Sequence, residues 1–260
     1  MSEKLITCLL ALMLVVWVPG NVPAVEPVPL ATVLATLEAP FRQQAQAPSR
    51  ITDFSAEFTQ LSTIVAISRT QRAQGEVWFR FRNAAGDTMP LPQFRWNYRT
   101  PAVQEVVSDG STLWVYQQEN QQVVISDISR VNIDYGDNPL TFFSGLGDLA
   151  RDFYIDWAQP RQDAEGHYQL LLKPQQESRF FRHIKVIVHA DAVASAQNGS
   201  NSRKLSVFPM VATEVEDPQG NLTKILFDNP QWNINLAESH FIFDVPPGVE
   251  QVIPEKDMAF

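Results

Sequence analysis

The chain has 260 residues, of which 45% are hydrophobic and 19% are charged, and this composition excludes a mainly disordered protein. Its formal net charge of -9 disfavours a nucleic-acid-binding protein, which usually carries a basic surface. The length suits one large domain or two small ones, and no shift in composition divides the sequence.

The N-terminal segment has the pattern of an export signal. Leu5 to Val18 form an uninterrupted apolar run of 14 residues, shorter than the roughly 17 to 25 residues of a membrane-spanning helix. Val22 and Ala24 then have the spacing of the small residues at a signal-peptidase site. We therefore expect residues 1–24 to be a cleaved signal peptide and residues 25–260 to form a single β domain. An uncleaved anchor is the alternative.

One helix and a long series of strands follow. Leu30, Val33, Leu34 and Leu37 recur at helical spacing, and Pro40 ends the helix that they predict. Alternating or continuous apolar residues between turn signals predict strands at 53–60, 75–82, 93–100, 103–128 (a meander with two hairpin turns), 166–174, 181–190, 206–217, 221–232 and 240–247.

The strand expected at 93–100 has two very different faces. Phe94, Trp96 and Tyr98 alternate with arginine and asparagine, so one face is wholly aromatic and the other wholly polar. Trp78, Trp114 and Tyr116 also fall on neighbouring predicted strands in the first half of the domain. An aromatic face of this size indicates either a sealed core or the lining of an apolar binding cavity.

A helix is expected to interrupt the strands at residues 138–153. Asn138 suits the N-cap position, and Pro139 suits the first helical position. Gly145 and Gly147 each weaken this helix by roughly 1 kcal/mol relative to alanine. We expect a loosely held apolar helix that closes over the aromatic face as a lid.

These elements predict a mainly β protein, with a single antiparallel sheet curled into an unclosed barrel and a helical lid over an apolar cavity. About ten strands are expected. The polar stretch from Asp191 to Lys204 is expected to be a surface loop.

The sequence offers no recognisable catalytic centre. The only cysteine, Cys8, lies in the expected signal peptide, and the four histidines are scattered along the chain. Carboxylates flank the expected lid helix, and a solvated helix end explains them. We expect no enzymatic activity, no metal and no cofactor.

Several segments, taken in order, resemble the LolA family of periplasmic carriers of outer-membrane lipoproteins. The resemblance covers about residues 28 to 252. The segments that carry it are Phe54 to Gln60 (F-x-A-x-F-x-Q), Gly75 to Trp78 (G-x-x-W), Phe94 to Trp96 (F-x-W), Ser108 to Tyr116 (SDGSTLWVY), Asn138 to Phe143 (NPLTFF) and Phe241 to Val249 (F-x-F-x-x-P-x-G-V).

This resemblance implies a monomeric periplasmic carrier that takes acyl chains from an inner-membrane ABC transporter and passes them to an outer-membrane receptor. Phe94 falls on the family's phenylalanine that matters in the exchange with the transporter. Together with the aromatic pattern, the resemblance predicts an acyl-chain site lined by Phe58, Trp78, Phe94, Trp96, Tyr98, Leu113, Val115, Leu140, Phe142, Phe143 and Leu146.

Two questions stay open at the level of sequence. The family arginine that helps latch the lid has no clean match, and Arg80 or Arg82 are the alternatives unless the latch differs. The cargo is either a lipoprotein or another lipid or glycolipid, and in the latter case the protein is a binding protein or an envelope-stress sensor. A scaffold with a permanently filled core is a further alternative.

Overall fold

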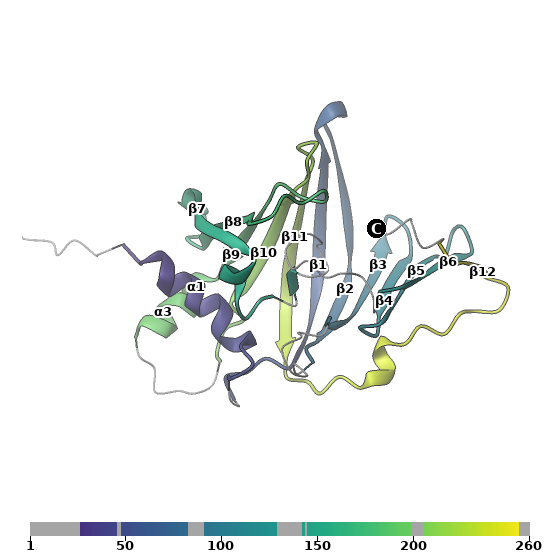
Figure 1. Ribbon diagram of the computed structural model, residues 1–260, viewed down its shortest axis with the longest axis horizontal. Helices are drawn as coiled ribbons and strands as arrows, with labels where there is room; N and C mark the ends of the chain where they lie inside the picture. The colour runs from purple at the N-terminus through teal and green to yellow at the C-terminus, as the bar shows by residue number, and fades with distance from the viewer. Residues whose placement is uncertain are drawn as a thin grey trace, which may run out of the picture.

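The computed structural model describes residues 27–45, 48–82, 91–128, 142–143, 145–198 and 205–254. These residues form one 12-stranded sheet that is not closed into a barrel, with strand order β12-β6-β5-β4-β3-β2-β1-β11-β10-β9-β8-β7 (Figure 1). The predicted mainly β, unclosed architecture is therefore confirmed. The expected signal peptide lies outside the described residues, and its cleavage stays a prediction.

The elements have the following bounds. The strands are β1 Asp53–Ile64, β2 Arg69–Arg80, β3 Gln93–Thr100, β4 Gln104–Ser108, β5 Thr112–Gln117, β6 Gln122–Asp127, β7 Phe153–Gln162, β8 Tyr168–Pro174, β9 His183–Val188, β10 Met210–Glu216, β11 Leu222–Trp232 and β12 Glu250–Val252. The helices are α1 Leu30–Glu38 and α3 Ala190–Gln197, and short 3-10 turns are η1 Ala39–Phe41, η2 Val65–Ile67, η3 Leu149–Arg151 and η4 Glu238–Phe241. Neither α1 nor α3 is long and apolar enough to cross a bilayer.

Strand β1 joins the two halves of the sheet. It pairs antiparallel with β2 on one side and with β11 on the other, so the N-terminal and C-terminal halves of the chain meet there. The other pairings are also antiparallel, except that β12 runs parallel to β6. The two hairpin turns expected between residues 103 and 128 are confirmed as the β4–β5 and β5–β6 connections.

Helix α1 covers one face of the sheet. Its apolar stripe faces the main apolar core as the spacing predicts: Val33 and Leu37 are fully enclosed, and Leu30 and Leu34 are partly buried against it. Pro40 lies at the start of η1, directly after the helix, which confirms the predicted end. Helix α3 packs beside α1 (Figure 1).

The C-terminal segment, residues 233–249 between β11 and β12, covers part of the opposite face. Phe243 packs with Val107 of β4 and Val123 of β6 in a second, smaller core. The prediction of a strand at 240–247 is therefore wrong. Its alternation is real, since Phe241 and Phe243 are buried and Ile242 is half exposed, but the segment forms η4 and then runs over the sheet without a pairing partner.

Two further expectations are wrong. The stretch expected as a loop from Asp191 forms α3 as far as Gln197, because alanines dominate it and Ala192 and Val193 are buried. The helix expected to reach Phe153 stops earlier, and β7 begins at that residue. The sequence of β7 shows no clear apolar alternation, because most of its side chains are exposed and many are polar or charged.

Candidate functional site

Seven aromatic rings from four adjacent strands gather on the face that α1 covers. Strand pairing aligns Phe79 of β2 with Phe54 and Phe94, and it aligns Gly75 with Phe58 and Tyr98. We call the set the ring cluster: Phe54, Phe58, Phe79, Phe94, Trp96, Tyr98 and Phe227.

The rings of the cluster contact one another edge to face or stacked. The Phe58 ring centroid lies 4.9 Å from those of both Trp96 and Tyr98. The Phe79 centroid lies 5.1 Å from that of Phe54 and 5.9 Å from that of Phe94. Such distances are typical of favourable aromatic pairs. The cluster is therefore a continuous apolar surface rather than a set of isolated side chains.

Gly75 makes this packing possible. A Cβ at this position would lie 2.0 Å from the Asn97 carbonyl oxygen and 2.9 Å from the Phe58 ring. Only glycine lets β3 and the Phe58 side chain approach β2 so closely. This gives a physical reason for the glycine of the G-x-x-W segment.

Phe142 and Phe143 lie directly against the ring cluster. The Phe143 ring stacks on that of Phe79 with centroids 4.4 Å apart, and the Phe142 ring lies 5.2 Å from that of Phe143. Both residues are helical, and Leu146 behind them is fully buried. We call residues 142–143 and 145–148 the lid segment. In this structure the lid segment is closed on the rings.

The C-terminal end of the lid segment is fixed to α1. The Leu149 N–H donates to Glu38 Oε1 at 2.8 Å, and both residues are buried. Glu38 also forms an ion pair with Arg42 at 2.8 Å. At Gly147 a Cβ would lie 2.8 Å from the Phe41 carbonyl oxygen. The lid segment is thus anchored at Gly147 and Leu149, while its two rings are held by apolar contacts.

Tyr98 is the one ionisable member of the ring cluster. Its hydroxyl donates to Gln60 Oε1 at 2.9 Å. Burial raises the pKa of the Tyr98 phenol to about 12. The cluster therefore presents an uncharged surface at neutral pH, and the Tyr98 hydroxyl has its hydrogen-bond partner in Gln60.

The structure brings most of the predicted site residues together. Nine lie in the same apolar core: Phe58, Phe94, Trp96, Tyr98, Leu113, Val115, Phe142, Phe143 and Leu146. Leu140 lies outside the described residues. Whether the nine contact an acyl chain stays a prediction.

Trp78 does not lie with this set, and the prediction that it lines the site is wrong. Val77 and Phe79 point to the ring cluster, so Trp78 between them points to the opposite face. There its ring lies 4.9 Å from that of His240 in the C-terminal segment. Trp78 therefore does not line the candidate site.

The two candidate latch arginines also lie apart. Arg80 is on the face that Trp78 occupies and forms an ion pair with Glu238 at 3.2 Å. Arg82 lines a small cavity together with Phe143 and Leu146. Of the two, only Arg82 is near the lid segment.

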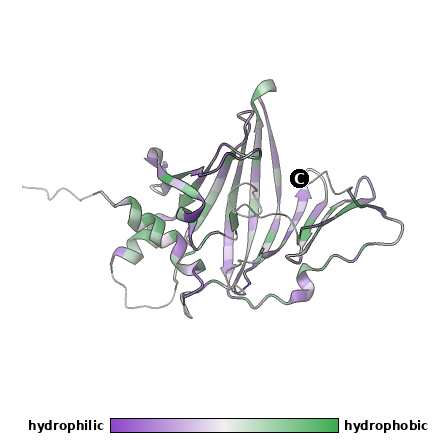
Figure 2. Cartoon of the chain, in the orientation of Figure 1, coloured by the Kyte–Doolittle hydropathy of each residue, from purple (hydrophilic) through white to green (hydrophobic). Residues whose placement is uncertain are grey.

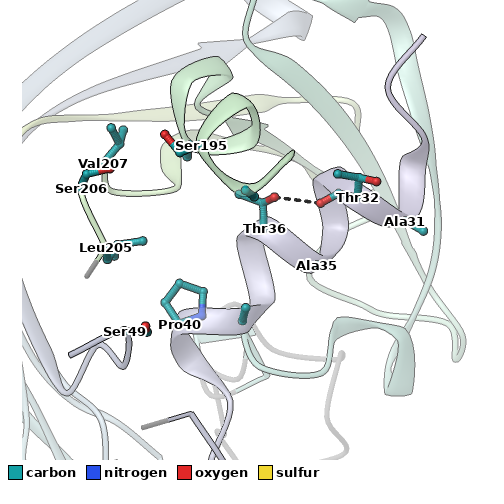
Figure 3. A pocket seen from close by; sticks show the side chains of 13 residues that line it. Ala31, Thr32, Ala35, Thr36, Pro40, Ser49, Ser195, Leu205, Ser206 and Val207 are labelled. Carbon is teal, nitrogen blue, oxygen red and sulfur yellow. Dashed lines mark hydrogen bonds between the residues drawn. The ribbon is translucent and has the colours of Figure 1, made fainter. Parts of the chain in front are cut away.

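Sequence reasoning missed a cavity of about 620 Å³ between α1 and α3 (Figure 3). The Thr36 hydroxyl, one of its lining groups, donates to the Thr32 carbonyl oxygen at 2.8 Å. The available signal was Ala31, Ala35 and Ala39, which recur every four residues and leave one side of the helix small. This cavity lies within the helical layer rather than on the rings.

The chemistry of the site is that of apolar binding. Among the described residues, no three His, Cys, Asp or Glu side chains lie close enough to hold a metal ion. The ring cluster and lid segment offer two apolar surfaces that bury one another. An arrangement of this kind can exchange the lid rings for a flexible apolar ligand.

The chain is similar to known lipoprotein carrier proteins over most of its length. The family model described as "Outer membrane lipoprotein carrier protein LolA" matches residues 49–198. An outer-membrane lipoprotein carrier protein of Alkalilimnicola ehrlichii is 25% identical over 221 residues, which cover 85% of this chain and 86% of that protein. A protein of the same name from Bordetella avium is 25% identical over 236 residues, covering 91% and 98%. A solved LolA superfamily protein from Nitrosomonas europaea is 12% identical with a TM-score of 0.38, covering 84% of this chain and 99% of that one.

Proposed function

Because the chain belongs to the LolA family of outer membrane lipoprotein carrier proteins, we propose that it binds the acyl chains of lipoproteins and carries them through the periplasm to the outer membrane. The observation that supports this role is the closed lid segment, in which Phe143 stacks on Phe79 over the ring cluster. The family is one of carriers rather than enzymes, and the proposed role breaks no bond.

The energetics of the exchange follow from burial. An acyl chain gains about 0.8 kcal/mol for each CH₂ that it buries. In the empty protein, the contacts of Phe142 and Phe143 with the rings already remove much of the same surface from water. The net affinity is the difference between the two states, which keeps binding reversible.

The remaining parts of the proposal concern the route. The chain is exported with loss of residues 1–24 and acts in the periplasm as a monomer. It receives lipoproteins from an inner-membrane ABC transporter and delivers them to an outer-membrane receptor. These partners and this location rest on family membership and on the N-terminal apolar run.

The proposal is tested by mixing the purified chain with a triacylated lipoprotein in detergent, then diluting the detergent and recording native mass spectra. We expect a soluble one-to-one complex. Trp96→Ala removes a ring of the cluster and is expected to lower the yield of complex about tenfold. Trp114→Ala is the matched control, because Trp114 is also half buried but packs in the second core on the opposite face.

Both variants are first checked for a native circular dichroism spectrum. Equal losses for Trp96→Ala and Trp114→Ala would contradict the assignment of the ring cluster as the site. Precipitation of the lipoprotein while the chain stays alone in solution would contradict lipoprotein as the cargo. Lipid extracted from the purified chain would then identify the alternative cargo.

A further inference from the structure

The β1–β2 hairpin ends in an exposed apolar tip. We define the tip as residues 64–67, of which Val65–Ile67 form η2. Val65 is 51% exposed and Ile67 is 62% exposed. The hairpin rises above the neighbouring strands in Figure 1, and its tip is hydrophobic in Figure 2. Exposed aliphatic side chains that are grouped in this way indicate a contact surface.

The tip is held in a defined conformation. All twelve residues of β1 pair with β2, from Asp53 to Ile64. The Val65 N–H donates to Asn221 Oδ1 at 3.1 Å, which ties the tip to the turn between β10 and β11. Ser68 adopts a left-handed conformation (φ 49°), and its N–H donates to the Val65 carbonyl oxygen at 3.1 Å. The apolar side chains are therefore presented outward by a rigid support.

Two cations flank the apolar tip. Arg69 and Arg72 are exposed, and neither forms an ion pair with another residue that the structure describes. The acidic residues at the adjoining end of β10 are both engaged. The Asp217 carboxylate accepts from Asn221 Nδ2 at 2.7 Å, and Glu216 is paired with Arg182 at 3.2 Å. The chain has a net charge of -9, but these two arginines form a positively charged patch beside the tip.

We infer that the tip inserts Val65 and Ile67 into the interfacial layer of a bilayer that contains anionic phospholipid, while Arg69 and Arg72 bind lipid phosphates. An apolar centre with a basic rim is the arrangement of interfacial membrane anchors. The tip is convex and narrow, so it suits a deformable lipid surface better than a flat protein surface. This contact goes beyond the proposed carriage of acyl chains, because it brings the carrier itself to the membrane.

The small size of the tip makes the contact weak and reversible. Even a whole myristoyl chain gives only marginal membrane binding, and the tip offers far fewer apolar groups. Each arginine near an anionic surface is expected to contribute about a fivefold increase in partitioning. A carrier that visits a membrane and leaves again needs binding of this strength.

The test uses the chain from residue 25, which keeps every described helix and strand and lacks the apolar run of residues 5–18. It also lacks Cys8, so Ile67→Cys introduces a single site for the environment-sensitive dye NBD. Ile242→Cys is the matched control, since Ile242 is a 50% exposed isoleucine in the C-terminal segment. Vesicles of phosphatidylethanolamine with phosphatidylglycerol are added, with no lipoprotein present.

We expect NBD emission at position 67 to rise at least about twofold and shift to the blue, with no change at position 242. Arg69→Gln with Arg72→Gln is expected to lower partitioning about 25-fold on these vesicles. An unchanged NBD signal at position 67 on anionic vesicles would overturn the inference, and the surface would then belong to a protein partner. Because no lipoprotein is used, failure here is distinguishable from failure of the proposed carrier function.

Discussion

Tyr98 illustrates how the site combines an apolar surface with one polar group. Its ring contacts Phe58 at 4.9 Å, and its hydroxyl reaches Gln60 at 2.9 Å. Because burial penalises the phenolate, the phenol stays neutral in the folded protein. The stability of the folded state must therefore depend on pH in the alkaline range.

We predict that Tyr98 lowers the free energy of unfolding as the pH rises from about 10 to about 12. The folded-state pKa of about 12 exceeds the reference value of 10.0, so the folded protein binds more protons than the unfolded chain in this window. The contribution is fully present below pH 10 and falls by roughly 2 to 3 kcal/mol by pH 12. Urea unfolding of wild type and Tyr98→Phe across this range measures it. Parallel curves for the two proteins would contradict the prediction.

The two tryptophans Trp78 and Trp96 show what sequence can decide at this scale. Alternation predicted correctly that Phe94, Trp96 and Tyr98 share one face. The same alternation along β2 separates Trp78 from Val77 and Phe79, but both faces of the sheet carry apolar clusters, so alternation does not show which face holds the site. Only the position of α1 and of the C-terminal segment distinguishes the face with the ring cluster from the other.

At the scale of elements, the lid segment depends on α1. Glu38 accepts the Leu149 N–H from within a buried environment, so the end of α1 positions the end of the lid segment. The two lid rings, by contrast, are held only by apolar contacts with the cluster and its surroundings. We therefore expect the rings to separate from the cluster while the anchor at Leu149 stays intact.

Two substitutions at Glu38 distinguish the contribution of its hydrogen bond to stability from the contribution of its charge. Glu38→Ala leaves the buried Leu149 N–H unpaired and is expected to lower the free energy of unfolding by about 1 to 3 kcal/mol. Glu38→Gln keeps a carbonyl acceptor and is expected to retain most of the stability. Hydrogen exchange at the Leu149 amide, together with urea unfolding, distinguishes them. Equal protection of this amide in wild type and Glu38→Ala would show that Glu38 is not the anchor.

Elements with a strong apolar period were predictable, and weakly patterned ones were not. Helix α1 ends at Glu38, two residues before Pro40, and the chain continues as the 3-10 turn η1. Helix α3 was hidden because its small residues resemble a polar loop, and it is stabilised by packing beside α1. Whether residues 190–197 form a helix thus depends on tertiary contacts, which the sequence alone does not show.

At the scale of the molecule, one open sheet supports two different apolar surfaces. On one face, α1 and the lid segment cover the ring cluster, and on the other the chain's own C-terminal segment covers Val107 and Val123. The C-terminal cover continues into β12, which pairs with β6. Among the described residues, the lid segment is held by the Leu149–Glu38 hydrogen bond, by the close approach of Gly147 to Phe41 and by the contacts of its two rings. Because the lid segment is attached less firmly than the C-terminal segment, we predict that the lid segment can leave the ring cluster while the C-terminal segment stays on the opposite face.

The proposed carrier function requires acyl chains to bind to the face of the sheet that carries Trp96. The most direct measurement is photocrosslinking with p-benzoylphenylalanine in place of Trp96 on β3 or in place of Trp78 on β2. Both residues are half buried on adjacent strands, but they point to opposite faces. After loading with a triacylated lipoprotein, we expect adducts to the acyl chains from position 96 and none from position 78. Adducts from position 78, or from neither position in a soluble complex, would show that acyl chains do not bind to the ring cluster.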